Sequence, residues 1–105
     1  MAGLDAYQSG MAREPVNQPS RSSLKAIGAR LVALRESTGL RQVDFCKRAG
    51  IAQNTWNQYE RGESRPQLDF AIRLVDTFGV TLDWIYLGDS SGLPHTLALA
   101  IQRRA

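Results

Sequence analysis

The sequence contains one cysteine, Cys46, and lacks the long apolar runs of membrane proteins. A single cysteine excludes an internal disulfide and a cysteine-based zinc site. No apolar run approaches the roughly 20 residues that span a membrane, and residues 1–23 contain no apolar core of a secretory signal. We therefore expect a protein of the reducing cytoplasm without membrane contact, and we interpret Cys46 as a small core residue.

Patterns typical of catalysis or metal binding are also missing. The only histidine, His95, has no metal-ligand partners at a suitable spacing, and the chain has no glycine-rich phosphate loop, Ser/His/Asp set or paired-carboxylate site. The sequence thus predicts no enzymatic activity, no cofactor and no metal. No segment alternates between apolar and polar residues as a strand would, so the chain is predicted to be all-α.

The net charge of +3 is unevenly distributed along the 105 residues. Residues 24–65 hold eight basic and four acidic side chains, whereas residues 66–92 hold one arginine and four aspartates. A basic half beside an acidic half favours a surface that meets a polyanion. A chance fluctuation of surface charge would give the same pattern, so charge alone leaves both readings open.

Helical periodicity and turn residues divide the chain into three parts. Residues 1–22 lack periodicity and predict a flexible N-terminal arm, residues 23–88 predict a helical domain, and residues 89–105 predict a linker followed by a helix, a dimerisation tail or a frayed tail. Within the domain, caps and glycines predict five short helices, over about 24–38, 42–49, 52–61, 68–78 and 82–88.

The segment 68–78 has the most regular apolar pattern in the chain. Its apolar residues recur at helical spacing and predict a buried stripe formed by Leu68, Ala71, Ile72, Val75 and Phe78. In the short helix that follows, Trp84 and Tyr86 cannot both face the core, because side chains two positions apart point in different directions.

The segment "AQNTWNQYERG", residues 52–62, predicts a helix with two unlike faces. Ala52, Trp56 and Tyr59 lie together at i, i+4 and i+7 and can anchor the helix to a core. The opposite face carries four amides, Gln53, Asn54, Asn57 and Gln58. An asparagine or glutamine amide can bind the donor and acceptor of an adenine edge together, so this face suits the major groove of DNA. A solvated polar surface is the alternative.

The run "LRQVDFCKRAGIAQNTWNQYERGESRPQLDFAIRLVDTFGVTLDWIY" resembles the helix-turn-helix domains of the phage Cro/C1 repressor (XRE) family, over about residues 24–87. The resemblance implies a five-helix lambda-repressor-like bundle. It implies that Gln53, Asn54 and Gln58 reach base edges, with Asn57 as a fourth reader. It also implies that Gln42 touches a phosphate or an outer base and that Thr55 and Arg61 lie near the DNA backbone.

Two further expectations concern charged residues, the first from the resemblance and the second from phosphate chemistry. Arg35 and Glu60 occupy positions that resemble the family's internal ion pair, which would fix the third helix to the first. Arg41, Lys47, Arg48, Arg61 and Arg65 surround the amides and could neutralise phosphates.

The sequence departs from the family pattern at the starts of the second and third helices. Arg41 and Ala52 stand where a Ser or Thr is frequent, and neither side chain can accept a capping hydrogen bond. Asn54 could cap the third helix instead, which would remove it from base reading.

We therefore expect a sequence-specific transcriptional regulator of the repressor type, associated with the nucleoid. It would act as a homodimer on a near-palindromic double-stranded DNA operator. The dimer surface would use residues 93–105 or the exposed part of the segment 83–87. The alternative is an antitoxin or adaptor that binds a protein partner through the C-terminal segment.

Overall fold

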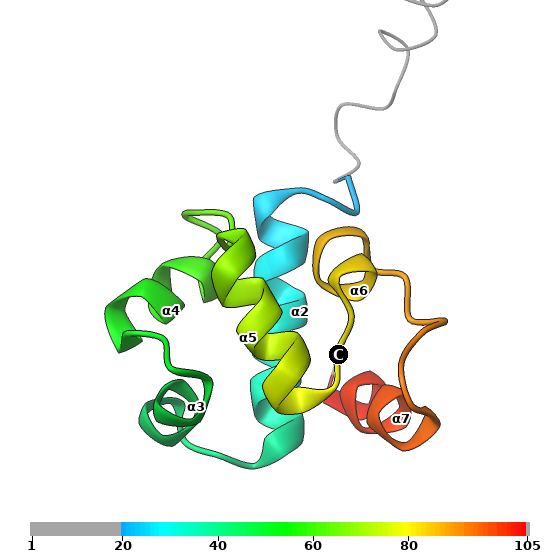
Figure 1. Ribbon diagram of the computed structural model, residues 1–105. Helices are drawn as coiled ribbons and strands as arrows, with labels where there is room; N and C mark the ends of the chain where they lie inside the picture. The colour runs from blue at the N-terminus through cyan, green and yellow to red at the C-terminus, as the bar shows by residue number, and fades with distance from the viewer. Residues whose placement is uncertain (1–19, 105) are drawn as a thin grey trace, which may run out of the picture.

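The computed structural model describes residues 20–104, which fold into helices joined by short loops (Figure 1). The helices are α2 (Leu24–Thr38), α3 (Gln42–Ala49), α4 (Gln53–Glu60), α5 (Leu68–Phe78), α6 (Leu82–Leu87) and α7 (His95–Arg104). No strand occurs in this part of the chain, which confirms the all-α prediction. Five helices were predicted within the domain. The sixth, α7, lies in the C-terminal segment, for which the sequence allowed a helix, a dimerisation tail or a frayed tail. Most of the predicted N-terminal arm, residues 1–19, lies outside the described residues.

Caps and glycines set the ends of the helices. Ser23 precedes α2, and its hydroxyl accepts a hydrogen bond from the Ala26 N–H. Thr81 caps α6 in the same way by accepting from the Trp84 N–H. Gly39 ends α2 at φ 73°, a left-handed conformation that glycine adopts without steric cost. α3 and α4 start at Arg41 and Ala52 without a side-chain capping bond.

α2 is the central helix of the fold. α4 packs on one side of it and α7 on another, and α5 lies in front of it in Figure 1. The approach of α4 is close because residue 28 of α2 is glycine. A Cβ atom at Gly28 would lie 2.8 Å from the carbonyl oxygens of both Tyr59 and Glu60. Gly28 therefore allows the backbone of α2 to contact the C-terminal end of α4.

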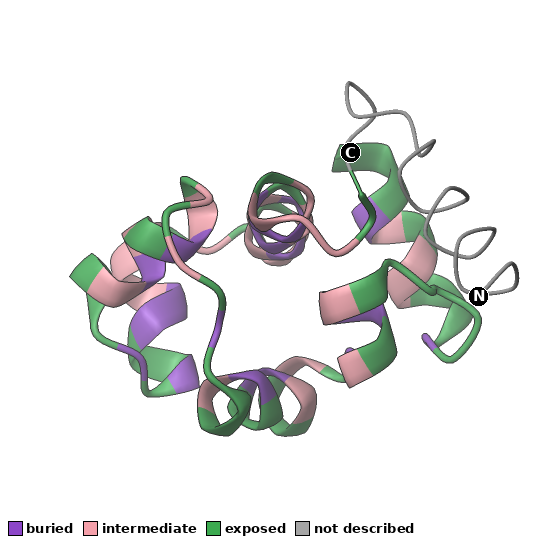
Figure 2. Ribbon diagram, turned by 90° about the horizontal axis from the view of Figure 1, so that it is seen from above, coloured by how far each residue is buried: buried purple, intermediate pink, exposed green. Residues whose placement is uncertain are grey.

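The core lies in the middle of the bundle, where the buried faces of the helices meet (Figure 2). The Phe45 ring of α3 stacks on the Phe78 ring of α5, with centroids 4.4 Å apart, and is tilted against the Trp56 ring at 4.7 Å. Aromatic pairs of this kind add to the free energy of burial. This cluster fastens α3 and α4 to α5. Cys46 is buried nearby as predicted, and burial raises the pKa of its thiol.

The predicted buried stripe of α5 was partly wrong. Leu68 and Ile72 are 56% and 41% exposed, whereas Leu74, which the stripe omitted, is fully buried together with Ala71. Leu74 lies three positions after Ala71 and four before Phe78, so these three residues define the inward face. Leu68 and Ile72 lie beside that face and remain open to solvent.

The C-terminal segment packs against the rest of the bundle. Leu93 and Ile101 are buried, and residues 95–104 form a helix, α7, that packs against α2. In α6, Trp84 is buried and Tyr86 is half-buried, with its hydroxyl donating to the Pro66 carbonyl at 2.7 Å. The two aromatic side chains are therefore divided between the core and the surface, as their spacing predicted.

Candidate nucleic-acid interface

α4 separates its apolar and polar side chains as its sequence predicted. Trp56 and Tyr59 are buried, with 0% and 3% of their surface exposed. Gln53, Asn54 and Gln58 are exposed. The burial of two large aromatic side chains contributes several kcal/mol, which holds the helix to the core while its amides face outward.

The outward side of α4 is connected to α3 by a chain of side-chain hydrogen bonds. Gln53 Nε2 donates to Gln42 Oε1 at 2.9 Å, and Gln42 Nε2 donates to Asn57 Oδ1 at 2.7 Å. The same Gln42 nitrogen lies 3.3 Å from Glu60 Oε1. Gln42 therefore orients two of the four predicted base-reading amides.

Glu60 joins this chain to the core. Its Oε2 atom accepts from Arg35 Nε at 2.6 Å and from the Trp56 indole Nε1 at 2.5 Å. The Arg35 and Glu60 side chains are 21% and 10% exposed, so the pair is largely shielded from water. The hydrogen bond to Glu60 raises the pKa of Arg35. We call the connected side chains the α4 network; its members are Arg35, Gln42, Gln53, Trp56, Asn57 and Glu60.

Asn54 supports the start of α4. Its side-chain Oδ1 accepts a hydrogen bond from the N–H of Thr55 at 3.0 Å. Thr55 lies in the first turn, where backbone N–H groups have no partner within the helix. Since Ala52 offers no side-chain acceptor, Asn54 takes over part of the capping role. Its amide nitrogen faces no acceptor among residues 20–104 at hydrogen-bonding distance.

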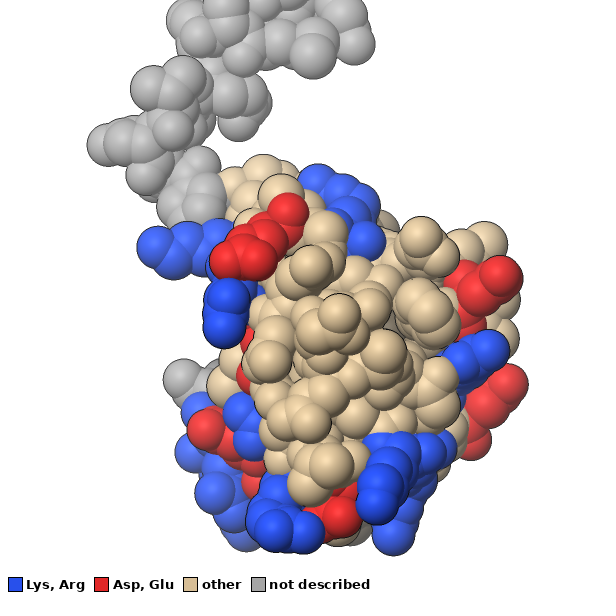
Figure 3. Space-filling view, turned by 90° about the vertical axis from the view of Figure 1, so that its left-hand side faces the viewer, with Lys and Arg blue, Asp and Glu red and all other residues tan. Residues whose placement is uncertain are grey.

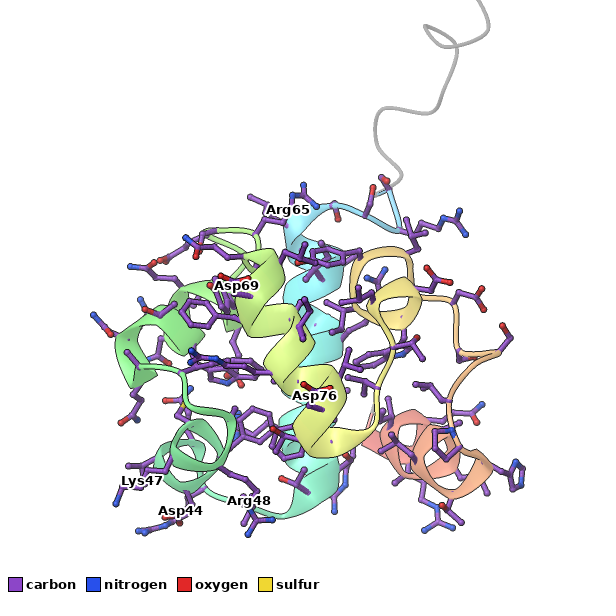
Figure 4. All side chains as sticks on the ribbon, in the orientation of Figure 1. Asp44, Lys47, Arg48, Arg65, Asp69 and Asp76 are labelled. Carbon is purple, nitrogen blue, oxygen red and sulfur yellow. The ribbon has the colours of Figure 1, made fainter. Side chains whose placement is uncertain are left out.

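Basic side chains surround the uncharged amides. Figure 3 shows the side of the molecule on which α3 and α4 lie, with a broad uncharged centre and, around its edge, lysine and arginine together with some aspartate and glutamate. Lys47 and Arg48 are exposed at the C-terminal end of α3, below α4 in Figure 4. Asp69 and Asp76 lie on α5 instead. Residues 41–65 hold five basic and three acidic side chains, so the α3–α4 side carries a small excess of positive charge.

The other basic residues near the amides, Arg41, Arg61 and Arg65, form ion pairs or hydrogen bonds within the protein. Arg41 Nε lies 3.0 Å from Asp44 Oδ2, and Arg61 Nη1 lies 3.7 Å from Glu63 Oε2. Both pairs are exposed, and exposed ion pairs are weak, so either arginine can leave its partner for another anion. Arg65 donates to the Ser22 carbonyl at 2.6 Å and ties the loop after α4 to the start of α2.

The geometry adds two connections that the sequence reading missed. Gln42 was expected to face DNA, yet it also donates to Asn57 and Glu60 inside the protein. The Trp56 indole was expected to serve only as an apolar anchor, yet it donates to Glu60. The spacing of four between Trp56 and Glu60 on one helix was a usable signal for the second connection.

A metal centre and a membrane span were also looked for in the part of the chain that the structure describes. Residues 20–104 contain no group of three or more His, Cys, Asp and Glu side chains that could hold a metal ion. Among the same residues, none of the helices combines the length and apolar character needed to cross a membrane.

Comparison with protein families identifies the class of this domain. A family described as "Helix-turn-helix domain" matches residues 26–84, which run from α2 into α6 and cover more than half of the chain. The chain therefore belongs to this helix-turn-helix family, and the resemblance predicted from the sequence is confirmed. Searches of curated proteins and of solved structures found no match.

Proposed function

We propose that the protein is a sequence-specific DNA-binding transcriptional regulator that inserts α4 into the major groove. The observation that carries this proposal is the outer face of α4, where exposed amides are held on an anchored helix and surrounded by basic side chains. Amides discriminate between base edges, and lysines and arginines neutralise phosphates. Membership of a helix-turn-helix family supports the same conclusion.

The α4 network suggests a role for each amide. We propose that Gln53 reads a base while Gln42 orients it, and that Gln42 also touches the DNA backbone. Gln58 is exposed and reads a second base. Asn57 has committed its oxygen to Gln42, so it would contact a base through its amide nitrogen. Asn54 likewise has its nitrogen available while its oxygen accepts from Thr55.

The backbone contacts would come from both helices of the motif. We propose phosphate contacts for Arg41, Lys47, Arg48, Thr55 and Arg61. Neither Arg41 nor Ala52 caps the helix that it precedes, so N–H groups of the first turns of α3 and α4, except that of Thr55, can point at phosphates. The recognition helix of such a motif contacts bases mainly through its N-terminal residues, which agrees with the position of Gln53 and Asn54.

We propose that two copies act together as a repressor in the cytoplasm, at the nucleoid. One domain of this size offers a small interface, so specific binding would need a second copy one helical turn, about 34 Å, along the DNA. Occupancy of a near-palindromic operator would then exclude polymerase.

Selection of bound sequences from a random pool of double-stranded DNA tests this function. We expect a near-palindromic preferred site, with affinity that falls steeply as salt rises, because each neutralised phosphate adds about 0.9 to the log–log slope. Failure to bind any duplex at low salt would refute the proposal.

Variants of the selected complex separate base reading from phosphate binding. Gln58→Ala should cost about 1–3 kcal/mol on the preferred site and relax the preference at one position. Lys47→Ala should weaken all sequences alike and reduce the salt slope by about 1. Arg103→Ala on α7, across α2 from α4, is the matched control and should change neither quantity. If Gln58→Ala keeps the same DNA sequence preference, Gln58 does not read a base.

The C-terminal segment supports a second candidate, an antitoxin or adaptor that binds a protein partner. α7 is folded on α2 and exposes Leu99 at 39%. An adaptor of this kind would keep its partner after the DNA-facing side is disabled. Lys47→Ala combined with Gln58→Ala should therefore abolish the function of a regulator in cells and leave that of an adaptor intact.

A further inference from the structure

A hollow of about 540 Å³ lies on the side of α2 that faces α6 and α7. Its apolar wall is formed by Val32 and Ala33 of α2, Trp84 of α6 and Ile101 of α7. Volumes of roughly 300–1,000 Å³ with mainly apolar walls are typical of small-molecule sites. We call this space the C-terminal hollow.

The charged residues that line the C-terminal hollow are both arginines, Arg30 and Arg104. Among residues 20–104, no carboxylate lines it and neither arginine forms an ion pair with an acidic side chain. An apolar wall with positive charge at its edge complements a molecule that has an apolar body and one negative group.

Arg30 is held in place by the fold. Its Nη1 donates to the Ile85 carbonyl at 2.7 Å, and its Nη2 donates to the Arg21 carbonyl. Its guanidinium also lies against Gly88, where an added Cβ would come within 3.0 Å of Nε. A fixed cation loses little conformational entropy when it meets an anion, which favours binding. Burial and the positive charge of Arg21 lower the pKa of Arg30, and the negative charge of a bound anion would act in the opposite direction.

We propose that the C-terminal hollow binds a small amphipathic organic anion, with its apolar part against Trp84 and Ile101 and its carboxylate at Arg30 and Arg104. Such a ligand would bridge α7 to α2 and α6 and so stabilise the packing of α7. α6 and α7, whose residues line the hollow together with those of α2, lie on the opposite side of α2 from α4 (Figure 1), so a ligand there leaves the amide face uncovered. The proposal is independent of DNA binding and can fail or succeed separately.

Two-dimensional NMR of the full chain, titrated with sodium octanoate, tests this site. Octanoate should shift the indole N–H signal of Trp84 and the backbone signals of residues 29–33, and should leave the indole signal of Trp56 unchanged. The uncharged analogue 1-octanol should bind at least about tenfold more weakly, because it cannot pair with the arginines. Equal binding of the two probes, or shifts centred on α4, would overturn the proposal.

Substitution of Arg104, one of the two arginines that line the hollow, provides a second test. Arg104→Ala should weaken octanoate binding severalfold, and Arg104→Glu should weaken it more, while Arg103→Ala, which does not line the hollow, should bind like the original chain. Arg104 is exposed, so these variants should fold normally. Identical affinity in all of these variants contradicts the proposal. It is also contradicted if protein concentration alone shifts the same signals, since the occupant would then be a second copy.

Discussion

Glu60 has more side-chain partners than any other single carboxylate described around α4. It accepts from Arg35 and from the Trp56 indole, and lies within reach of Gln42. A carboxylate that satisfies buried donors is costly to replace, because a charge or an N–H group is left without a partner. At the scale of single residues, Glu60 therefore controls both the position of α4 and the orientation of its amides.

Glu60→Gln should reduce the free energy of unfolding by about 3 kcal/mol, since it leaves the shielded Arg35 guanidinium without a counter-charge. Urea denaturation followed by circular dichroism measures the change. Glu63→Gln is the matched control, because its pair with Arg61 is exposed, and should cost less than about 0.5 kcal/mol. Equal effects of the two substitutions would mean that the Arg35–Glu60 pair contributes no more than a surface pair.

Asn54 can be assigned to capping or to base reading by two substitutions. Asn54→Ala removes the acceptor for the Thr55 N–H and should cost about 0.5–1 kcal/mol of stability. Asn54→Asp keeps that acceptor and should retain stability, yet its charge would repel DNA. Stability and operator affinity are measured for both. If Asn54→Asp binds the operator as tightly as the original chain, Asn54 is a cap and not a reader.

At the scale of helices, the contact between α2 and α4 depends on a missing side chain. Alanine normally stabilises a helix by about 1 kcal/mol relative to glycine. At Gly28 the added methyl group would meet two carbonyl oxygens at 2.8 Å, so the usual preference is reversed.

Gly28→Ala should destabilise the domain by about 1–3 kcal/mol, the range of overpacked cores, and shift α4 away from α2. Thermal unfolding measures the loss, and operator affinity reports the displacement of the amides. Lys25→Ala on the same helix is the control; its side chain is exposed and its loss should be nearly neutral. A Gly28→Ala variant more stable than the original chain would contradict the close approach.

The helices themselves could be predicted from sequence because their ends are marked locally. Ser23, Gly39 and Thr81 carry signals that need no tertiary information, and the predicted ranges 24–38, 42–49 and 68–78 agree with the structure. The inward face of α5 could not be fixed, because apolar residues cover more than half of its circumference. Periodicity then allows several faces of α5 to point inward. The face that contains Phe78 points inward because Phe78 packs against Phe45 of α3.

The two faces of α4 were predictable from the sequence, but the hydrogen bonds that connect its side chains were not. The two-faced pattern of residues 52–61 placed the amides outside and the aromatic side chains inside. The hydrogen bond from Gln42 to Asn57 joins residues 15 positions apart on different helices. Its formation depends on the relative placement of α3 and α4, which local sequence does not encode.

At the scale of the whole molecule, α7 and the helix-turn-helix motif share α2 as their support. Ile101 of α7 and Trp84 of α6 both line the C-terminal hollow, and both are buried. The helices should therefore unfold together and not as a domain with a separate tail.

Ile101→Ala should lower the free energy of unfolding by about 2–4 kcal/mol, as expected for a buried isoleucine. Circular dichroism and tryptophan fluorescence should report coincident transitions, because α7 belongs to the same cooperative unit. Leu99→Ala removes an exposed leucine of the same helix and should have a much smaller effect. Transitions at different urea concentrations for the two probes would indicate that α7 unfolds independently.

The α4 network also determines how freely new DNA specificities could evolve or be engineered in this domain. Gln42, Gln53 and Asn57 hydrogen-bond to one another, so a change in one alters the surroundings of the others. Among residues 20–104, the side chain of Gln58 belongs to no such chain and is exposed. A combinatorial library confined to position 58 should therefore sample new binding preferences on an unchanged scaffold. In a library at positions 42, 53 and 57, functional variants should mainly carry changes at two or three of these positions together.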